Sequence, residues 1–461
     1  MGTKFAAAII VLSSLLCGSF LVSGQASESW RHQLREEAQQ CRLDRLSARP
    51  PSHRLESEGG VVELWDESEE EFQCAGVGAV RIIIRPNSLS LPKFHSSPML
   101  FYVEQGEGVV GLNYPGCPEI YEAESGEFST TPAKRRGRAV RGVRDQHQKV
   151  HRVRRGHIVA VSAGTVEWLH NDGNKDLIVV AFMDLNNEAN QLDHQIRSFY
   201  MAGGASREGR QEGRGSEYLV NIFNGFDAEL LAEAFQVPRD LVRKMQQGSS
   251  REGLIVKCNE EMSFLRPDEQ EEELSSRNGV EETVCTRKIR YDMNTHKESD
   301  LYSREAGRVN IVNEHKLPIL RFLGISAEKA HLFPNAGYNL HWSMTDHRLV
   351  YVVEGEVEVQ IADDKGKQVF NERVSRGNMF VIPQFYSTMA RAGPKGAEWI
   401  TFKTSNQPRK SPVVGYTSVF RGLPQQVLEQ AFQISPREAQ DLKQARRQQS
   451  FLLPPFSGSR K

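Results

Sequence analysis

The sequence of 461 residues has almost no net charge and lacks the short motifs of common nucleotide-binding, hydrolytic and redox enzymes. Its 58 lysines and arginines nearly balance 59 aspartates and glutamates, so the composition gives no reason to expect a nucleic-acid partner. No Walker loop, G-x-S-x-G or C-x-x-C occurs, which removes the usual sequence support for those activities. No Asn-x-Ser/Thr occurs either, and N-glycosylation is therefore not expected.

Long apolar runs are also rare, and the one that exists lies at the N-terminus. Lys4 precedes "FAAAIIVLSSLLCGSFLV", and small residues follow in "VSGQAS". This order is typical of a secretory signal peptide, residues 1–24, with cleavage near Gly24. A membrane anchor is the alternative, because the run is almost long enough to span a bilayer. No other window approaches a membrane span, so we expect no membrane association after the signal is removed.

Cysteines are few, and their number after signal removal is odd. Cys17 leaves with the signal peptide, and Cys41, Cys74, Cys117, Cys258 and Cys285 remain. The secretory pathway permits disulfides, but counting alone does not give the pairing.

The chain contains an internal repeat of β-rich segments followed by helices. Both copies place alternating β-branched and aromatic residues around a glycine, which we interpret as a strand, a tight turn and a strand. An R-V-x-R-G motif with a buried-strand run follows in each copy, and then a helix with one apolar face. The matching pairs begin at Met99 and Arg348, at Arg152 and Arg373, and at Phe223 and Phe420.

Three segments interrupt this pattern. The first copy is longer between its glycines, which predicts an inserted loop over 113–151 that includes Cys117 and an arginine-rich run. We expect that run to be a solvated loop, because it lacks the interleaved aromatics of a nucleic-acid patch. Residues 203–217 are rich in glycine and charge, and residues 266–278 are acidic without an apolar face. Both are predicted to be disordered, the second as a linker between the copies.

The linker ends in Asn278-Gly279, a dipeptide that has two possible interpretations. Asn-Gly is a strong hairpin signal, but little alternating apolar sequence precedes it. Residues 279–461 hold 26 Lys and Arg against 19 Asp and Glu, a net charge of +7, which leaves −8 for residues 1–278. A cut at this exposed linker would therefore separate an acidic chain from a basic chain.

Four segments resemble the legumin-type, 11S seed storage globulins over nearly the whole mature chain. They are "NGVEETVCT", "ANQLDHQIRSFYMAGG", "VEWLHNDG" and "SVFRGLPQQVLEQAFQIS". The resemblance implies a mainly β bicupin: two antiparallel jelly-roll barrels, each followed by a helical arm. We expect the N-terminal cupin to span 25–265 and the C-terminal cupin 279–461. The resemblance also implies disulfides Cys41–Cys74 and Cys117–Cys285, with Cys258 free.

Enzymatic bicupins that act on oxalate are the main alternative, and they hold Mn or Fe with three histidines and a glutamate. In the C-terminal copy, the spacing from the glycines places the four ligand positions at His341, Ser343, Arg348 and Thr388. In the N-terminal copy the positions are Met99, Glu167 and either Pro92 with Phe94 or Lys93 with His95. Neither set can hold the metal, so we expect no metal, no cofactor and no catalytic residue.

The resemblance therefore implies a seed storage protein rather than an enzyme. It implies a route through the endoplasmic reticulum to a protein storage vacuole, and cleavage of Asn278–Gly279 by an asparaginyl endopeptidase. It further implies self-assembly into a homotrimer and then a homohexamer. An unprocessed vicilin-like or sugar-binding bicupin remains a third possibility.

Overall fold

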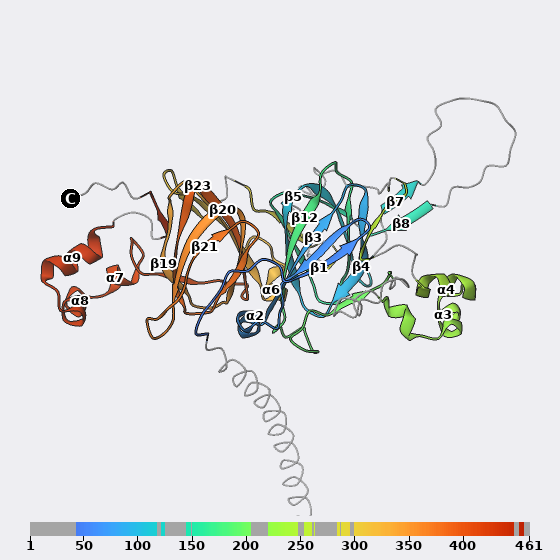
Figure 1. The fold of residues 1–461 in the computed structure, drawn as a ribbon, viewed down its shortest axis with the longest axis horizontal. Coiled ribbons are helices and arrows are strands. Elements are labelled where there is room, and N and C mark those ends of the chain that lie inside the picture. Colours follow the sequence, from blue (N-terminus) through green and yellow to red (C-terminus); the bar gives the residue numbers. More distant parts are fainter. Residues whose placement is uncertain are drawn as a thin grey trace, which may run out of the picture. The chain divides into compact units, whose positions relative to one another are not determined.

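The computed structural model describes residues 43–117, 121–124, 144–148, 150–203, 220–247, 253–260, 262, 284–285, 287–295, 299–446 and 451–455. The fold described below lies within the compact unit Arg45–Lys461. Figure 1 colours its first half mainly blue to green and its second half mainly yellow to red.

The first half is a barrel made of two antiparallel sheets. One sheet has the order β1-β2-β3-β12-β5-β10-β15, and the other has the order β13-β4-β11-β6-β9, with β14 also paired to β4. The strands of the first sheet are β1 (His53–Ser57), β2 (Gly60–Leu64), β3 (Val77–Ile84), β12 (Leu177–Asp184), β5 (Met99–Gln105), β10 (His157–Val161) and β15 (Arg290–Asp292). Those of the second are β13 (Ser198–Tyr200), β4 (Ser88–His95), β11 (Val166–Asn171), β6 (Glu107–Asn113), β9 (Val150–Arg154) and β14 (Ile255–Lys257). A separate pair joins β7 (Tyr121–Glu124) to β8 (Arg144–His147).

The second half repeats this plan in one curled ten-stranded sheet. Its strands are β16 (Leu301–Ser303), β17 (Gly307–Val312), β18 (Ser326–Leu332), β19 (Gly337–Ser343), β20 (Arg348–Ala362), β21 (Gln368–Ser375), β22 (Met379–Ile382), β23 (Ser387–Lys403), β24 (Lys410–Pro412) and β25 (Leu452–Leu453). Short helices α2 (Glu70–Ala75) and α6 (Leu320–Leu323) flank the barrels. The expected mainly β fold with two jelly-roll barrels is confirmed.

The predicted tight turns at the two repeat glycines are wrong, because the glycines turn corners between sheets. Strand β5 pairs with β12 and β10, whereas β6 pairs with β11 and β9, so the strands on either side of Gly106 do not pair with each other. In the second barrel Gly355 lies within the continuous strand β20, where the register shifts. Both glycines have a positive φ, +79° and +75°, and an added Cβ would approach a backbone carbonyl oxygen to 2.5 and 2.2 Å. Only glycine allows the chain to bend this tightly against its neighbour.

The two barrels share one hydrophobic core, which explains the long apolar runs in several strands. Residues Met99–Glu104 of β5 are all buried, and so is almost all of β12. One face of these strands points into the first barrel, and the other contacts the second barrel. The rings of Phe182 from β12 and Phe402 from β23 stack with centroids 5.3 Å apart. A strand that is buried on both faces cannot alternate between polar and apolar residues.

A helical arm follows each barrel, as expected from the repeat. The first contains η2 (Ile222–Gly225), α3 (Ala228–Phe235) and α4 (Arg239–Gln247), and the second contains α7 (Val419–Gly422), α8 (Gln425–Phe432) and α9 (Pro436–Gln444) (Figure 1). Phe223 contacts Phe235 edge-to-face in one arm, and Phe420 contacts Phe432 in the same way in the other. Helices α3 and α8 both end at a glutamine with a left-handed backbone.

Several sequence predictions concern residues outside the described part of the chain. These are the signal peptide with Gly24, the linker 266–278, the dipeptide Asn278-Gly279, Cys41, and most of the loops 113–151 and 203–217. Within the described residues, no helix is both long enough and apolar enough to cross a membrane.

Candidate functional sites: the chain junction and the barrel interiors

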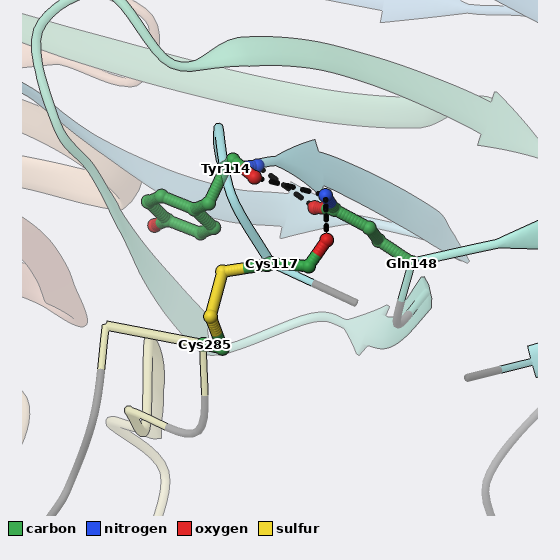
Figure 2. The surroundings of a disulfide bond; sticks show 4 residues. All are labelled: Tyr114, Cys117, Gln148 and Cys285. Carbon is green, nitrogen blue, oxygen red and sulfur yellow. Dashed lines mark hydrogen bonds between the residues drawn. A yellow bond between two sulfur atoms is a disulfide. The ribbon is translucent and has the colours of Figure 1, made fainter. Parts of the chain in front are cut away.

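A disulfide joins the inserted loop of the first barrel to the segment that follows the linker. Cys117 lies just after β6, and Cys285 lies 168 residues further along the chain. The side chain of Gln148 holds the Cys117 turn in place, since its Nε2 donates to the carbonyl oxygens of Cys117 and Tyr114 and its Oε1 accepts from Tyr114 N (Figure 2). The structure thus brings together the two cysteines that the resemblance pairs across the Asn278-Gly279 dipeptide.

The other cysteines occupy different surroundings. Cys74 lies in α2 and is disulfide-bonded, while Cys41 is outside the described residues. Cys258 keeps its thiol, with Sγ 4.0 Å from Nδ1 of His170. Sequence counting alone could not separate these cases, because it contains no information on which loops meet.

Backbone hydrogen bonds also join the two halves, and each half provides a segment that pairs with the other. Strand β15, which follows Cys285, adds to the sheet of the first barrel by pairing with β10. Conversely, the segment before β1 contacts the second barrel: Leu46 N donates to Val369 O, and Arg49 and Met379 exchange both backbone hydrogen bonds at 2.9 Å. Each half therefore contributes chain to the barrel of the other. No pattern in the sequence indicates this exchange.

The second barrel has an interior cavity at the positions predicted for cupin metal ligands. His341, Arg348 and Thr388 all line it, whereas Ser343 is directed to the Arg409 carbonyl at 3.5 Å and does not line it. His341 Nδ1 donates to Asn339 O at 2.7 Å, so Nε2 carries the lone pair of a neutral imidazole. Arg348 Nη1 donates to that Nε2 at 2.8 Å. Burial and the charge of Arg348 keep the pKa of His341 well below its usual value.

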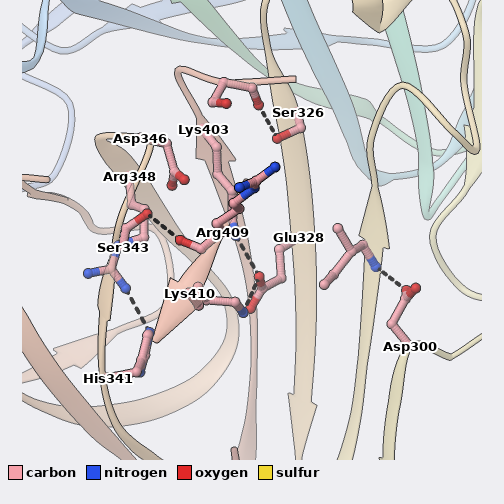
Figure 3. A network of polar contacts seen from close by, with 12 residues as sticks. Asp300, Ser326, Glu328, His341, Ser343, Asp346, Arg348, Lys403, Arg409 and Lys410 are labelled. Atoms are coloured by element: carbon pink, nitrogen blue, oxygen red, sulfur yellow. Dashed lines mark hydrogen bonds and ion pairs between the residues drawn. The ribbon is translucent and has the colours of Figure 1, made fainter. Parts of the chain in front are cut away.

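Three residues that the ligand pattern did not single out complete this cavity: Glu328, Lys403 and Lys410. Both ammonium groups contact Oε2 of Glu328, at 2.7 Å from Lys403 and 2.6 Å from Lys410 (Figure 3). The hydroxyl of Tyr338 donates to Oε1 of the same carboxylate at 2.7 Å. Burial alone would raise the pKa of Glu328, but the two lysines hold it well below its usual value. Burial lowers the pKa of Lys410 to about 8. A lysine at the end of the apolar run "WITF" is the one sequence signal that could have pointed to this cluster.

In the first barrel the structure decides between the two possible registers of β4. Lys93, His95, Met99 and Glu167 line one cavity, while Phe94 points elsewhere and stacks on Phe199 with centroids 4.9 Å apart. Lys93 Nζ and His95 Nε2 both lie 3.3 Å from Oε1 of Glu167. Although burial alone would raise it, these two neighbours lower the pKa of Glu167.

The polar groups of the first cavity form an ion-pair network rather than a catalytic base. Ser198 Oγ lies 3.1 Å from His95 Nδ1, so a serine, a histidine and a glutamate are in contact in the order of a hydrolase triad. However, Lys93 shares the carboxylate oxygen that faces His95 and neutralises its charge. The carboxylate is therefore not available to stabilise an imidazolium, as the mechanism of a serine nucleophile requires.

Neither cavity offers the donors that the cupin metal pattern requires. In the second barrel the single histidine lone pair already accepts from Arg348, and a guanidinium stands where the glutamate would be. In the first, Lys93 stands in a histidine position and binds the carboxylate itself. The described residues contain no group of three His, Cys, Asp or Glu side chains placed to hold a metal ion. A cation would meet an ammonium or guanidinium in either barrel.

Comparison with known proteins places the chain in a family. A family model described as Cupin matches residues 46–204 and 293–440, one segment in each barrel. Over 95% of this chain and 96% of the relative, the sequence is 48% identical to the 11S globulin seed storage protein 2 of Sesamum indicum. The chain belongs to the legumin-type, 11S globulin family of the cupin superfamily.

Further relatives of this globulin belong to the same family. The 11S globulin seed storage protein Ana o 2.0101 of Anacardium occidentale is 39% identical over 88% of this chain and 91% of its own. The crystal structure of procruciferin, the 11S globulin from Brassica napus, matches with a TM-score of 0.80 at 34% identity, covering 91% of this globulin and 99% of that chain. The relatives from Sesamum indicum and Anacardium occidentale are both named as seed storage proteins.

Proposed function

We propose that this globulin is a seed storage protein, a nutrient and nitrogen reservoir without catalytic activity. The observation that carries the proposal is the 48% identity, over nearly the full length, to a seed storage protein. The barrel interiors support it, since buried ion pairs occupy the positions at which enzymatic cupins hold a metal. The proposed route leads through the endoplasmic reticulum to a protein storage vacuole.

Maturation would consist of one cut, between Asn278 and Gly279, by an asparaginyl endopeptidase. The Cys117–Cys285 disulfide supports this proposal because it would keep the acidic and basic chains covalently joined after the cut. Strand β15 supports it as well, because the basic chain would keep a strand in the sheet of the first barrel. Signal cleavage near Gly24 and a Cys41–Cys74 disulfide complete the proposed maturation.

Assembly would proceed through the helical arms, first to a homotrimer and then, after cleavage, to a homohexamer. Each arm exposes large apolar side chains: Leu230 is 66% exposed and Phe235 47% in the first, and Val427 46% and Phe432 53% in the second. Apolar side chains in this number on short helices favour contact with another copy of the chain.

Incubation of the purified proprotein with an asparaginyl endopeptidase tests processing and assembly together. The expected product has a new N-terminus at Gly279 and grows from trimer to hexamer in sedimentation. Asn278→Gln should block both changes, whereas the nearby substitution Asn259→Gln should leave them intact. Cleavage of the Asn278→Gln variant at the same rate would contradict the proposed site.

Metal analysis of the purified protein separates the storage proposal from the enzymatic alternative. We expect no stoichiometric Mn or Fe and no turnover of oxalate. Bound metal with oxalate turnover would replace the storage proposal. An uncut chain in mature tissue would instead favour a vicilin-like or sugar-binding bicupin.

A further inference from the structure

The interior cavity of the second barrel contains more positive than negative charge. Three cations line it, Arg348, Lys403 and Lys410, against the single carboxylate of Glu328. Arg348 and Lys403 are 3% and 1% exposed, so bulk solvent screens these charges little. Outside the cavity, the buried carboxylate of Asp346 adds a second negative charge that acts on Arg348. The three cations and these two carboxylates together carry a net charge of +1. A buried net charge is costly unless an opposite charge accompanies it.

Arg348 also has a hydrogen-bond donor without an acceptor. Its Nη1 donates to His341 and its Nη2 to the Tyr386 carbonyl oxygen at 3.3 Å. Its Nε has no hydrogen-bond partner among the described residues. Leaving a buried donor unpaired is unfavourable, and for a guanidinium edge the best acceptor is a carboxylate.

The size and walls of the cavity limit what can bind. Its volume is about 40 Å³, which is room for about three water molecules. Val350, Val357 and Phe380 supply apolar walls beside the charged groups. A small acid with a short aliphatic part fits this combination, and one negative charge balances the net charge of the cluster.

We propose that the second barrel binds a small aliphatic monocarboxylate, of the size of acetate, between Arg348 and Lys410. Arg348 stands at the position where metal-binding cupins have a glutamate, so the charge at this position suits an anion rather than a cation. The site does not depend on cleavage at Asn278 or on assembly, so this proposal and the proposed storage function can fail separately.

Titration of the full-length protein with ¹³C-labelled acetate, followed by NMR and calorimetry, tests the proposal. At pH 6, below the Lys410 pKa of about 8, we expect saturable binding of one acetate per chain. For a ligand of four non-hydrogen atoms the dissociation constant should be about 1 mM. Methylammonium, a cation of similar size, should not bind. Absence of saturation by acetate, or equal displacement by chloride at the same concentration, would overturn the proposal.

Two cavity variants and a matched surface variant locate the site. Arg348→Met and Lys410→Met should each weaken acetate binding at least about tenfold, because each removes one charge that the carboxylate contacts. Arg373→Met, which removes an exposed arginine from β21 of the same barrel, should leave binding unchanged. Thermal melting of each variant shows whether it is folded. If Arg348→Met does not fold, Lys410→Met still tests the proposal. Full binding by a folded cavity variant would place acetate elsewhere and overturn the proposal.

Discussion

Asp184 ends strand β12 in the core of the first barrel, where the residue is only 6% exposed. Its carboxylate accepts a hydrogen bond from Asn187 Nδ2 at 3.2 Å, and no positive charge contacts it among the described residues. Burial therefore dominates and raises the pKa of Asp184 to about 6, from an ordinary value of 3.8. The substitution Asp184→Asn removes the charge and keeps the shape of the side chain.

The sign and size of the effect follow from proton linkage. Because the folded pKa of Asp184 lies above the unfolded one, the folded state binds more protons between pH 4 and 6, and stability falls as pH rises through this window. The buried charge should cost about 3 kcal/mol at pH 7 but only about 0.6 kcal/mol at pH 4. Asp184→Asn should therefore raise the free energy of unfolding much more at pH 7 than at pH 4.

Thermal unfolding of the wild type and the variant at both pH values measures this difference. Asp364→Asn is the matched control, because it removes the same charge from an exposed turn and should change the melting temperature little at either pH. A variant that melts below the wild type at pH 7 would refute the reasoning, since it would show that the charged form of Asp184 stabilises the fold.

Three further predictions concern the core and the chain junction. Lys329 and His331 hold the pKa of Glu398 at about 2 against the effect of burial, so the wild type should lose this stabilisation only as pH falls from about 4.5 to 2. Glu398→Gln should destabilise the protein by about 3 kcal/mol at pH 7, measured by denaturant unfolding, because it removes the carboxylate that neutralises the buried ammonium of Lys329. An unchanged midpoint would contradict this. Phe182→Ala should cost about 3–5 kcal/mol by removing one ring of the stack between the barrels, and a loss below about 1 kcal/mol would show that the barrels do not depend on it. After cleavage, reduction of the Cys117–Cys285 disulfide without denaturant should leave the two chains associated in gel filtration, because β15 remains paired to β10; separation on reduction alone would contradict that role of the strand.

The repeat and the barrel interiors could be predicted because local spacing determines them. A strand places every second residue on the same face, so counting from Gly355 placed His341 and Arg348, and counting from Gly156 placed Glu167, at ligand positions that do line the two cavities. The same counting could not choose between two registers of β4, because an unknown gap shifts every side chain to the opposite face. The glycines themselves were misinterpreted as hairpin turns, since a corner between sheets and a tight turn require the same positive φ.

The charged cluster and the exchanged strand could not be predicted, because they depend on contacts between distant parts of the chain. Glu328, Lys403 and Lys410 come from three different strands, β18, β23 and β24. They meet only because β18 and β19 both pair with β23, and β24 pairs with β19. Likewise, β15 has only three residues and no apolar pattern that distinguishes it from a loop. Its place in the first barrel follows from its partner β10, not from its own sequence.

Denaturing electrophoresis of the mature protein from its native tissue, with and without reductant, tests the central claim most directly. A two-chain storage globulin should give one band without reductant and two bands with it, and the smaller chain should begin at Gly279. The Cys117–Cys285 disulfide is the bond that this comparison opens. A single band under both conditions, or two bands without reductant, would contradict the account.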